Sequence, residues 1–121
     1  MKKILIVDND EDLAVIVSHV LKSNGFDVRT HPTGLKVSDV VDHYDPHLIL
    51  LDKRLYGESG TDICRELKRS YHIPIILCSG DNVKEEESAN YGADGFLPKP
   101  FSIDELLTTV NFHLERSKAD T

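Results

Sequence analysis

Short apolar runs recur along the chain, and most are followed at once by polar residues. The runs lie at residues 3–7, 48–51, 73–78 and 96–97. Runs of this length are typical of strands buried on both faces of a parallel sheet. A more polar segment at 26–31 predicts a further strand, near an edge of the same sheet. The pattern therefore predicts five strands, with 48–51 at the centre.

Between these runs, apolar residues recur three and four positions apart, which is the helical period. The residues with this spacing are Leu13, Ile16, Val17, Val20 and Leu21; Leu35, Val37, Val40, Val41 and Tyr44; Ile63, Cys64 and Leu67; and Ile103, Leu106, Val110 and Leu114. A further helix at about 83–91 has almost no apolar face. The spacing predicts five helices, one after each strand.

Polar residues mark where several of these helices begin. Asp10 is placed to accept a hydrogen bond as an N-cap, and Gly25 to end the first helix. Ser59 with Asp62, and Ser102 with Glu105, have the spacing of capping boxes. These signals place helix starts directly after the predicted strands or after short loops.

The alternation of strand and helix, five times over, predicts an α/β fold of doubly wound (βα)5 type. Its five-stranded parallel sheet has right-handed crossovers and helices on both faces. The 121 residues suffice for one domain, expected over 1–121, with a core at about 2–117 and a frayed tail at 118–121.

Charge and composition narrow the function. The chain has 14 Lys and Arg against 21 Asp and Glu, a formal net charge of −7, which argues against direct nucleic-acid binding. No apolar stretch of about 18 residues is present, so no membrane span is expected. We expect a cytoplasmic protein in which Cys64 and Cys78 are free and buried.

The candidate chemical residues all follow predicted strands. They are Asp8 and Asn9, Asp52, Ser79, and Lys99. The carboxyl ends of parallel strands meet at one edge of a sheet, where ligands bind in open α/β folds. Carboxylate and amide oxygens suit Mg²⁺, and a hydroxyl with an ammonium suits a phosphoryl group.

Simpler interpretations exist for each residue. Asp52 could merely cap the turn after its strand, Ser79 could cap the next helix, and Phe96 could be ordinary core. No G-x-G-x-x-G follows the first strand and no P-loop motif is present, which argues against dinucleotide and P-loop nucleotide binding.

The segments ILIVDND, LILLD, IPIILCSG and GADGFLPKPF together resemble the receiver domain of two-component response regulators, over essentially the whole chain. The resemblance implies a flavodoxin-like sheet of order 2-1-3-4-5. It also implies phosphotransfer from a histidine kinase or a phosphorelay histidine to an aspartate, with Mg²⁺ as cofactor. An output protein would bind at the face of the fourth helix, fifth strand and fifth helix. The implied protein is a stand-alone phosphoacceptor switch rather than an enzyme.

The resemblance assigns a role to each site residue. Asp52 is the implied phosphoacceptor. Asp8, Asn9, Asp52 and the backbone carbonyl of Arg54 are the implied metal ligands. Ser79 and Lys99 would contact the phosphoryl group, Phe96 would change rotamer on activation, and the bond before Pro100 would be cis.

The sequence departs from the family pattern in three places. Asn9 stands where a second carboxylate is usual, Tyr56 where Pro is common, and the segment from Ser79 to Gly92 is about two residues short. Asn9 keeps open an alternative function, that of a receiver without metal-dependent phosphorylation which serves as a docking or dimerisation module. A small-molecule binder of flavodoxin type is a third, weaker alternative.

Overall fold

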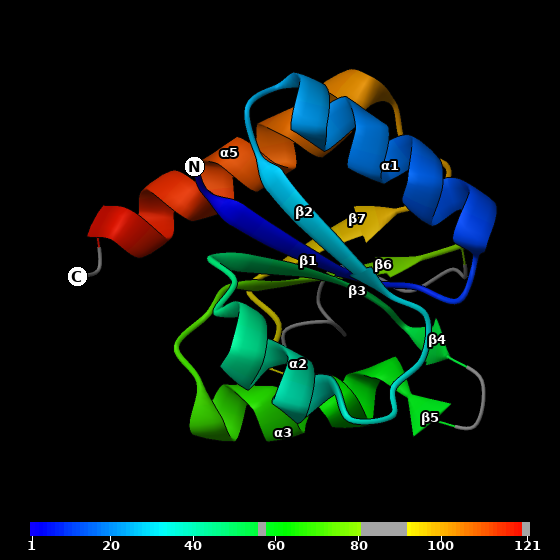
Figure 1. Ribbon diagram of the computed structural model, residues 1–121, viewed down its shortest axis with the longest axis vertical. Helices are drawn as coiled ribbons and strands as arrows, with labels where there is room; N and C mark the ends of the chain where they lie inside the picture. Colours follow the sequence, from blue (N-terminus) through cyan, green and yellow to red (C-terminus); the bar gives the residue numbers. More distant parts are fainter. Residues whose placement is uncertain (56–57, 81–91, 120–121) are drawn as a thin grey trace.

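Five parallel strands form a single sheet in the computed structural model, which describes residues 1–55, 58–80 and 92–119 (Figure 1). The strands are β1 (Lys3–Val7), β2 (Asp27–His31), β3 (Leu48–Asp52), β6 (Ile75–Ser79) and β7 (Gly95–Pro98). Their order is β2-β1-β3-β6-β7, which is 2-1-3-4-5 when the strands of this sheet are counted along the chain. The predicted fold class is confirmed, and the polar strand β2 lies at an edge as expected.

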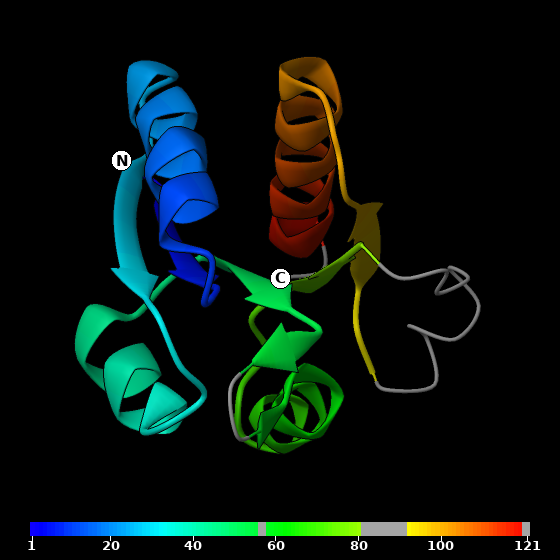
Figure 2. The same ribbon diagram turned by 90° about the vertical axis from the view of Figure 1, so that its right-hand side faces the viewer.

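Helices cover both faces of this sheet (Figure 2). On one face lie α1 (Glu11–Ser23) and α5 (Ile103–Ala119), and on the other lie α2 (Val37–Tyr44) and α3 (Gly60–Ser70). Side chains alternate along the strands, so Leu48 and Leu50 of β3 pack toward α1 and α5, while Ile49 and Leu51 pack toward α2 and α3. All five residues of β3 are buried, which explains why its sequence is a continuous apolar run.

Two capping predictions are confirmed. Asp10 Oδ1 accepts a hydrogen bond from the Leu13 amide at 3.1 Å, at the start of α1. Ser102 and Glu105 form a reciprocal capping box at the start of α5: the Glu105 amide donates to Ser102 Oγ at 3.0 Å, and the Ser102 amide donates to Glu105 Oε1 at 3.1 Å. Both helices are therefore fixed at their first turn.

The capping box predicted at Ser59 is wrong. Ser59 occupies the N-cap position of α3, but its side chain makes no capping hydrogen bond. Its hydroxyl lies 2.6 Å from the Thr61 hydroxyl instead. Ser59 belongs to β5 (Glu58–Ser59), which pairs antiparallel with β4 (Arg54–Leu55) in a small ribbon. The sequence predicted no strand in this segment.

Three helix positions assigned to the core are exposed. Ile16, in the middle of α1, is 60% exposed, so it lies on the solvent face of that helix. Leu35 precedes α2 and is 63% exposed, because the left-handed Lys36 at φ 58° separates it from the helix. Ile103 is the first residue of α5 and is 58% exposed. The other predicted residues of the α5 stripe, Leu106, Val110 and Leu114, are buried, so the stripe begins one turn later than predicted.

The remaining expectations concern the segment after β6, the end of α5 and membrane crossing. The helix predicted at about 83–91 lies outside the described residues. The helix α5 extends to Ala119, where the sequence predicted a frayed tail from residue 118. Among the described helices, none has both the length and the apolar character that crossing a membrane requires.

Candidate functional site

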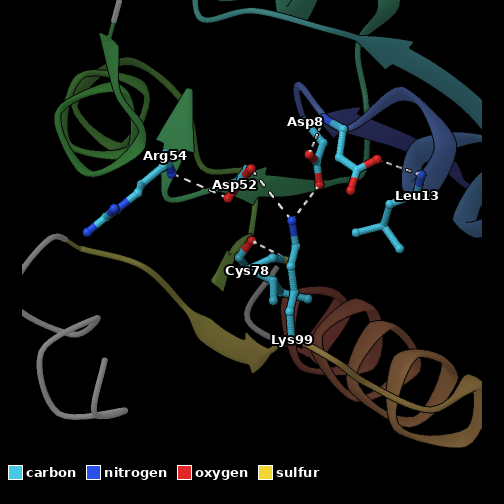
Figure 3. A network of polar contacts seen from close by, with 8 residues as sticks. Asp8, Leu13, Asp52, Arg54, Cys78 and Lys99 are labelled. Atoms are coloured by element: carbon cyan, nitrogen blue, oxygen red, sulfur yellow. Dashed lines mark hydrogen bonds and ion pairs between the residues drawn. The ribbon is translucent and has the colours of Figure 1, made fainter. Parts of the chain in front are cut away.

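Three charged side chains from three different strands meet at the carboxyl edge of the sheet (Figure 3). Asp8 directly follows β1, Asp52 ends β3, and Lys99 directly follows β7. The register brings them together, since Val7 of β1 pairs with Leu51, and Asp52 pairs with Cys78 of β6. We call Asp8, Asn9, Asp52 and Lys99 the strand-end cluster.

The Lys99 ammonium bridges the two carboxylates. Its Nζ lies 2.9 Å from Asp8 Oδ2 and 3.5 Å from Asp52 Oδ2. The Lys99 backbone amide donates to the Ser79 carbonyl at 2.8 Å, which continues the pairing of β6 and β7. The peptide bond from Lys99 to Pro100 is cis. The hydrogen bond to the Ser79 carbonyl holds the lysine backbone, and the two ion pairs hold its side chain.

Asp52 is a carboxylate in a mostly buried position. The residue is 9% exposed, and its Oδ1 accepts a hydrogen bond from the Arg54 amide at 3.3 Å. Burial raises the pKa of Asp52, and the nearby charge of Asp8 raises it further, while Lys99 and the Arg54 amide oppose the shift. A carboxylate that is costly to ionise is a better nucleophile than one stabilised by strong pairing.

Asp8 and Lys99 complement this arrangement. Burial alone would lower the pKa of Lys99, but its hydrogen bond to Asp8 and the charges of Asp8 and Asp52 outweigh burial and raise it. Lys99 therefore stays an ammonium ion at neutral pH. Asp8 Oδ1 accepts a hydrogen bond from the Asp10 amide at 2.9 Å, and Asp10 is engaged in capping α1.

The amide of Asn9 is oriented by its surroundings. One end of the amide lies 3.2 Å from the Arg54 carbonyl oxygen and 3.1 Å from Asp52 Oδ2. We assign this end as the nitrogen, because a nitrogen can donate to both oxygens, whereas an amide oxygen there would face two acceptors. Asn9 therefore lies between the Asp52 carboxylate and the Arg54 carbonyl, which the family resemblance implies as a metal ligand.

Ser79 and Phe96 lie close to the cluster along the sheet. Ser79 is buried, at the end of β6, one residue beyond the partner of Asp52. Phe96 of β7 is half-buried and packs against the apolar layer under α2 and α3. These positions place Ser79 at the same edge as Asp52, while the contacts of Phe96 are those of a core residue.

Cys78 lies beneath the cluster and is a second potential nucleophile. It is fully buried, and burial raises the pKa of its thiol to about 12. The thiol therefore stays protonated at neutral pH, and the thiol is the unreactive form of cysteine. Its carbonyl has a structural role, since it accepts a hydrogen bond from the Lys53 amide at 2.9 Å.

Gly60 is a site residue that the sequence reasoning missed. A Cβ at this position would overlap the Asp52 carbonyl oxygen and lie 2.8 Å from the Lys53 Cα. The Gly60 amide also donates to the Lys53 carbonyl at 2.8 Å. Only glycine lets the start of α3 approach the end of β3 this closely. Its signal in the sequence is a glycine shortly after the buried strand, between Ser59 and Asp62 of the predicted capping box.

The oxygen atoms around Asp52 fit a hard divalent cation. Within the described ranges, no three or more His, Cys, Asp or Glu side chains are grouped so as to hold a metal ion. The strand-end cluster supplies two carboxylates, of Asp8 and Asp52, and the Arg54 carbonyl lies within 3.2 Å of the Asn9 amide. Carboxylate, carbonyl and amide oxygens are the ligands that Mg²⁺ prefers, with water completing the set.

The chain matches known receiver domains in sequence and structure. The family model of the response regulator receiver domain matches residues 4–111. A CheY-like response regulator receiver domain protein from Methanospirillum hungatei JF-1 superimposes with a TM-score of 0.92 at 25% identity, over 100% of this chain and 99% of that one. The BeF3-activated N-terminal receiver domain of Klebsiella pneumoniae RstA gives 0.89 at 28% identity, over 93% and 98%. The receiver domain of the Francisella response regulator 1452 gives 0.89 at 27% identity, over 97% and 99%.

Proposed function

Because the chain belongs to the response regulator receiver domain family, we propose that it accepts a phosphoryl group on Asp52 from a phosphohistidine of a kinase or phosphorelay protein. An oxygen of the Asp52 carboxylate attacks phosphorus, and the bond from phosphorus to the histidine nitrogen breaks. The electron pair of that bond returns to the imidazole, and an acyl phosphate forms on Asp52. The observation that carries this proposal is the position of Asp52 at the buried end of the central strand, 3.5 Å from an ammonium.

Lys99 would stabilise the charge that arrives. A phosphoryl group adds about −1.5 to −2 charge at neutral pH. The Lys99 ammonium already contacts Asp8 and Asp52, so it is positioned to bind a phosphoryl oxygen with little movement of its backbone. The Ser79 hydroxyl, buried at the adjacent strand end, would contact the same phosphoryl group. Phe96 of β7 would change its rotamer when the protein is phosphorylated.

The residues that would hold Mg²⁺ are Asp8, Asp52, Asn9 and the Arg54 carbonyl. When bound, the cation would neutralise phosphoryl oxygens during transfer. The hydrogen bond from the Asp10 amide holds the Asp8 carboxylate at the site. The loss of one carboxylate at position 9 lowers the charge of the ligand set, so we expect weaker cation binding than a third carboxylate would give.

The output of the switch would be a change in protein binding. We place the partner surface on the side of β7 and α5, where Phe112 is 57% exposed on α5. The buried free thiols of Cys64 and Cys78 are consistent with a reducing compartment, and we place the protein in the cytoplasm. In this role the chain is a phosphoacceptor that assists its own phosphorylation rather than an enzyme acting on other substrates.

Intact-mass analysis tests the proposal. The wild-type protein, incubated with acetyl phosphate and Mg²⁺, should gain the mass of one phosphoryl group, and Asp52→Asn should gain none. The exposed Asp62 provides a matched control, since Asp62→Asn should react as the wild type does. An adduct that survives in Asp52→Asn assigns the reaction to another residue.

The same experiment separates the alternative function. A docking or dimerisation module without phosphorylation is favoured by one observation, the amide at position 9 in place of a carboxylate. If the wild type gains no phosphoryl group from acetyl phosphate or from phosphoramidate, with or without Mg²⁺, the switch proposal is wrong and the docking function replaces it.

A further inference from the structure

The Asn9 amide makes the same contacts that a bound cation would make. The end of the amide assigned as nitrogen lies 3.2 Å from the Arg54 carbonyl oxygen and 3.1 Å from Asp52 Oδ2. Both oxygens belong to the ligand set expected for the metal. A neutral donor with two N–H groups therefore satisfies these two acceptors without any cation.

Turning the amide by half a rotation converts this donor into a ligand. Nitrogen and oxygen of an amide nearly exchange positions in such a turn, so the oxygen would then lie about as far from the Arg54 carbonyl and Asp52 Oδ2 as the nitrogen does now. Neighbouring oxygens around an octahedral Mg²⁺, with bonds of about 2.0–2.1 Å, are roughly 2.9 Å apart. The present spacings of 3.2 and 3.1 Å are close to that value.

We propose that the Asn9 amide is a two-position element, with its nitrogen toward Asp52 in the metal-free protein and its oxygen toward the site when a divalent cation is bound. This inference rests on the proposed cation site of the phosphoacceptor. An aspartate at position 9 could not act in this way, because a carboxylate has no N–H and would repel Asp8 and Asp52. The amide thus stabilises the metal-free state, and it must give up two hydrogen bonds when it turns.

The amide and an aspartate at position 9 should differ in two measurable ways. The metal-free wild type should be more stable than Asn9→Asp, because no third carboxylate is confined beside Asp8 and Asp52. Cation binding should be weaker in the wild type, both because the ligand set has one charge less and because the amide turn opposes binding. We expect Mg²⁺ to bind Asn9→Asp roughly tenfold to thirtyfold more tightly.

The turn itself can be observed by NMR. The side-chain NH2 resonances of Asn9 are assigned by their disappearance in Asn9→Ala, and Mg²⁺ is titrated into the ¹⁵N-labelled wild type. We expect both resonances to shift and their exchange with water to accelerate as the N–H groups leave Asp52 and Arg54. The side-chain resonances of Asn111, which is exposed on α5, should not respond.

Thermal unfolding with and without Mg²⁺ provides the second measurement. Asn9→Asp should unfold at a lower temperature than the wild type in the absence of the cation, and should gain more from its addition. Asn111→Asp makes the same change of charge away from the site and should show neither effect. Equal Mg²⁺ affinity in Asn9→Asp and the wild type would overturn the proposal.

The proposal also fails if Mg²⁺ shifts backbone amides beside Asp52 but not the Asn9 NH2, or if it shifts nothing in the wild type. Neither result depends on phosphorylation. A normal phosphoryl adduct on Asp52 with an unmoved Asn9 amide would refute the turn and leave the proposed function standing. If the amide turns on Mg²⁺ addition but the protein forms no phosphoryl adduct, the turn is supported and the proposed phosphoacceptor function is refuted.

Discussion

Removing the charge of Lys99 should destabilise the fold through the two carboxylates that it bridges. We consider Lys99→Met, because methionine keeps a flexible unbranched side chain and removes the ammonium. In the wild type the Lys99 side chain is 19% exposed, against 8% for Asp8 and 11% for Asp52. In the variant, both carboxylates stay mostly buried at the same sheet edge, and the ammonium that paired with them is gone.

The distances set an upper bound on the effect. At an effective dielectric constant of about 20, attraction over 2.9 Å is worth about 5.7 kcal/mol, and over 3.5 Å about 4.7 kcal/mol. The desolvation of Lys99 offsets much of this gain. Asp52 can also take up a proton once the ammonium is gone. We therefore expect Lys99→Met to lower the free energy of unfolding by about 2–3 kcal/mol at neutral pH, less than the ~3–5 kcal/mol typical of a fully buried pair.

The loss should depend on pH in a defined direction. Without Lys99, the charge that opposes the raised pKa of Asp52 is absent, so the pKa of Asp52 rises further. A group whose pKa is higher in the folded than in the unfolded state contributes stability below its unfolded pKa, and this contribution is lost as pH rises through the folded pKa. The variant should therefore lose more stability at about pH 8 than at about pH 5.

Urea unfolding followed by circular dichroism measures this effect, since the chain has no Trp. Lys68→Met is the matched control, because Lys68 pairs with Asp94 at 2.8 Å in a more exposed position and should cost about 1 kcal/mol or less. In an Asp52→Asn background the cost of Lys99→Met should shrink. A loss no greater than that of Lys68→Met, or one unchanged by Asp52→Asn, would refute the reasoning.

Two further predictions concern Gly60, beside the site, and His113, which lies against Gly95 at the start of β7. Gly60→Ala should lower the free energy of unfolding by about 2–4 kcal/mol and slow phosphorylation, because its Cβ overlaps the Asp52 carbonyl oxygen. Gly25→Ala, with open space but a φ of +89°, should cost only about 1 kcal/mol in the same urea titration. Burial lowers the pKa of His113, so its contribution to stability should be lost as pH falls from about 6.5 through the folded pKa. His113→Gln should flatten this acid side of the stability profile relative to the exposed His19→Gln, and an unchanged profile would contradict the assignment.

The sheet could be predicted from the sequence because burial on both faces leaves a direct trace. The residues Leu48–Leu51 of β3 each face an apolar layer, and the first polar residue of the strand, Asp52, stands at its carboxyl end. The edge strand β2 reveals itself by the opposite trait, polar residues on both faces. These properties depend on the residues themselves, so a single sequence contains them.

Local details failed where neighbours in space decide the outcome. Ser59 matched the capping pattern, but its backbone is used by the ribbon with Arg54 and its hydroxyl contacts Thr61. Leu35 matched the helical period, but the left-handed backbone of Lys36 follows it, and α2 begins only at Val37. In both cases the residue matched the expected sequence spacing. The local backbone conformation, which residue spacing does not reveal, placed the residue outside the predicted role.

The strand-end cluster shows the same division. Asp8, Asp52 and Lys99 could be brought together from the sequence, because each directly follows or ends a predicted parallel strand. The orientation of the Asn9 amide could not, since it depends on which atoms of Arg54 and Asp52 face it. Gly60 was missed for a related reason: its importance is the absence of a side chain beside the Asp52 carbonyl, and a single sequence does not show what lies beside a glycine.

The charges of the cluster suggest why a residue at position 9 matters more for the resting state than for the phosphorylated one. Burial raises the pKa of Asp52, and the charge of Asp8 raises it further. At rest, two carboxylates face one ammonium, so the described side chains of the cluster leave about one negative charge. A third carboxylate would add to it, whereas the Asn9 amide supplies two donors and no charge. Phosphorylation on Asp52 would replace one negative charge by about 1.5 to 2, so the demand on Lys99 rises whichever residue stands at position 9. The amide thus avoids further repulsion between carboxylates in the unphosphorylated protein. It leaves Lys99 able to bind a phosphoryl group on Asp52.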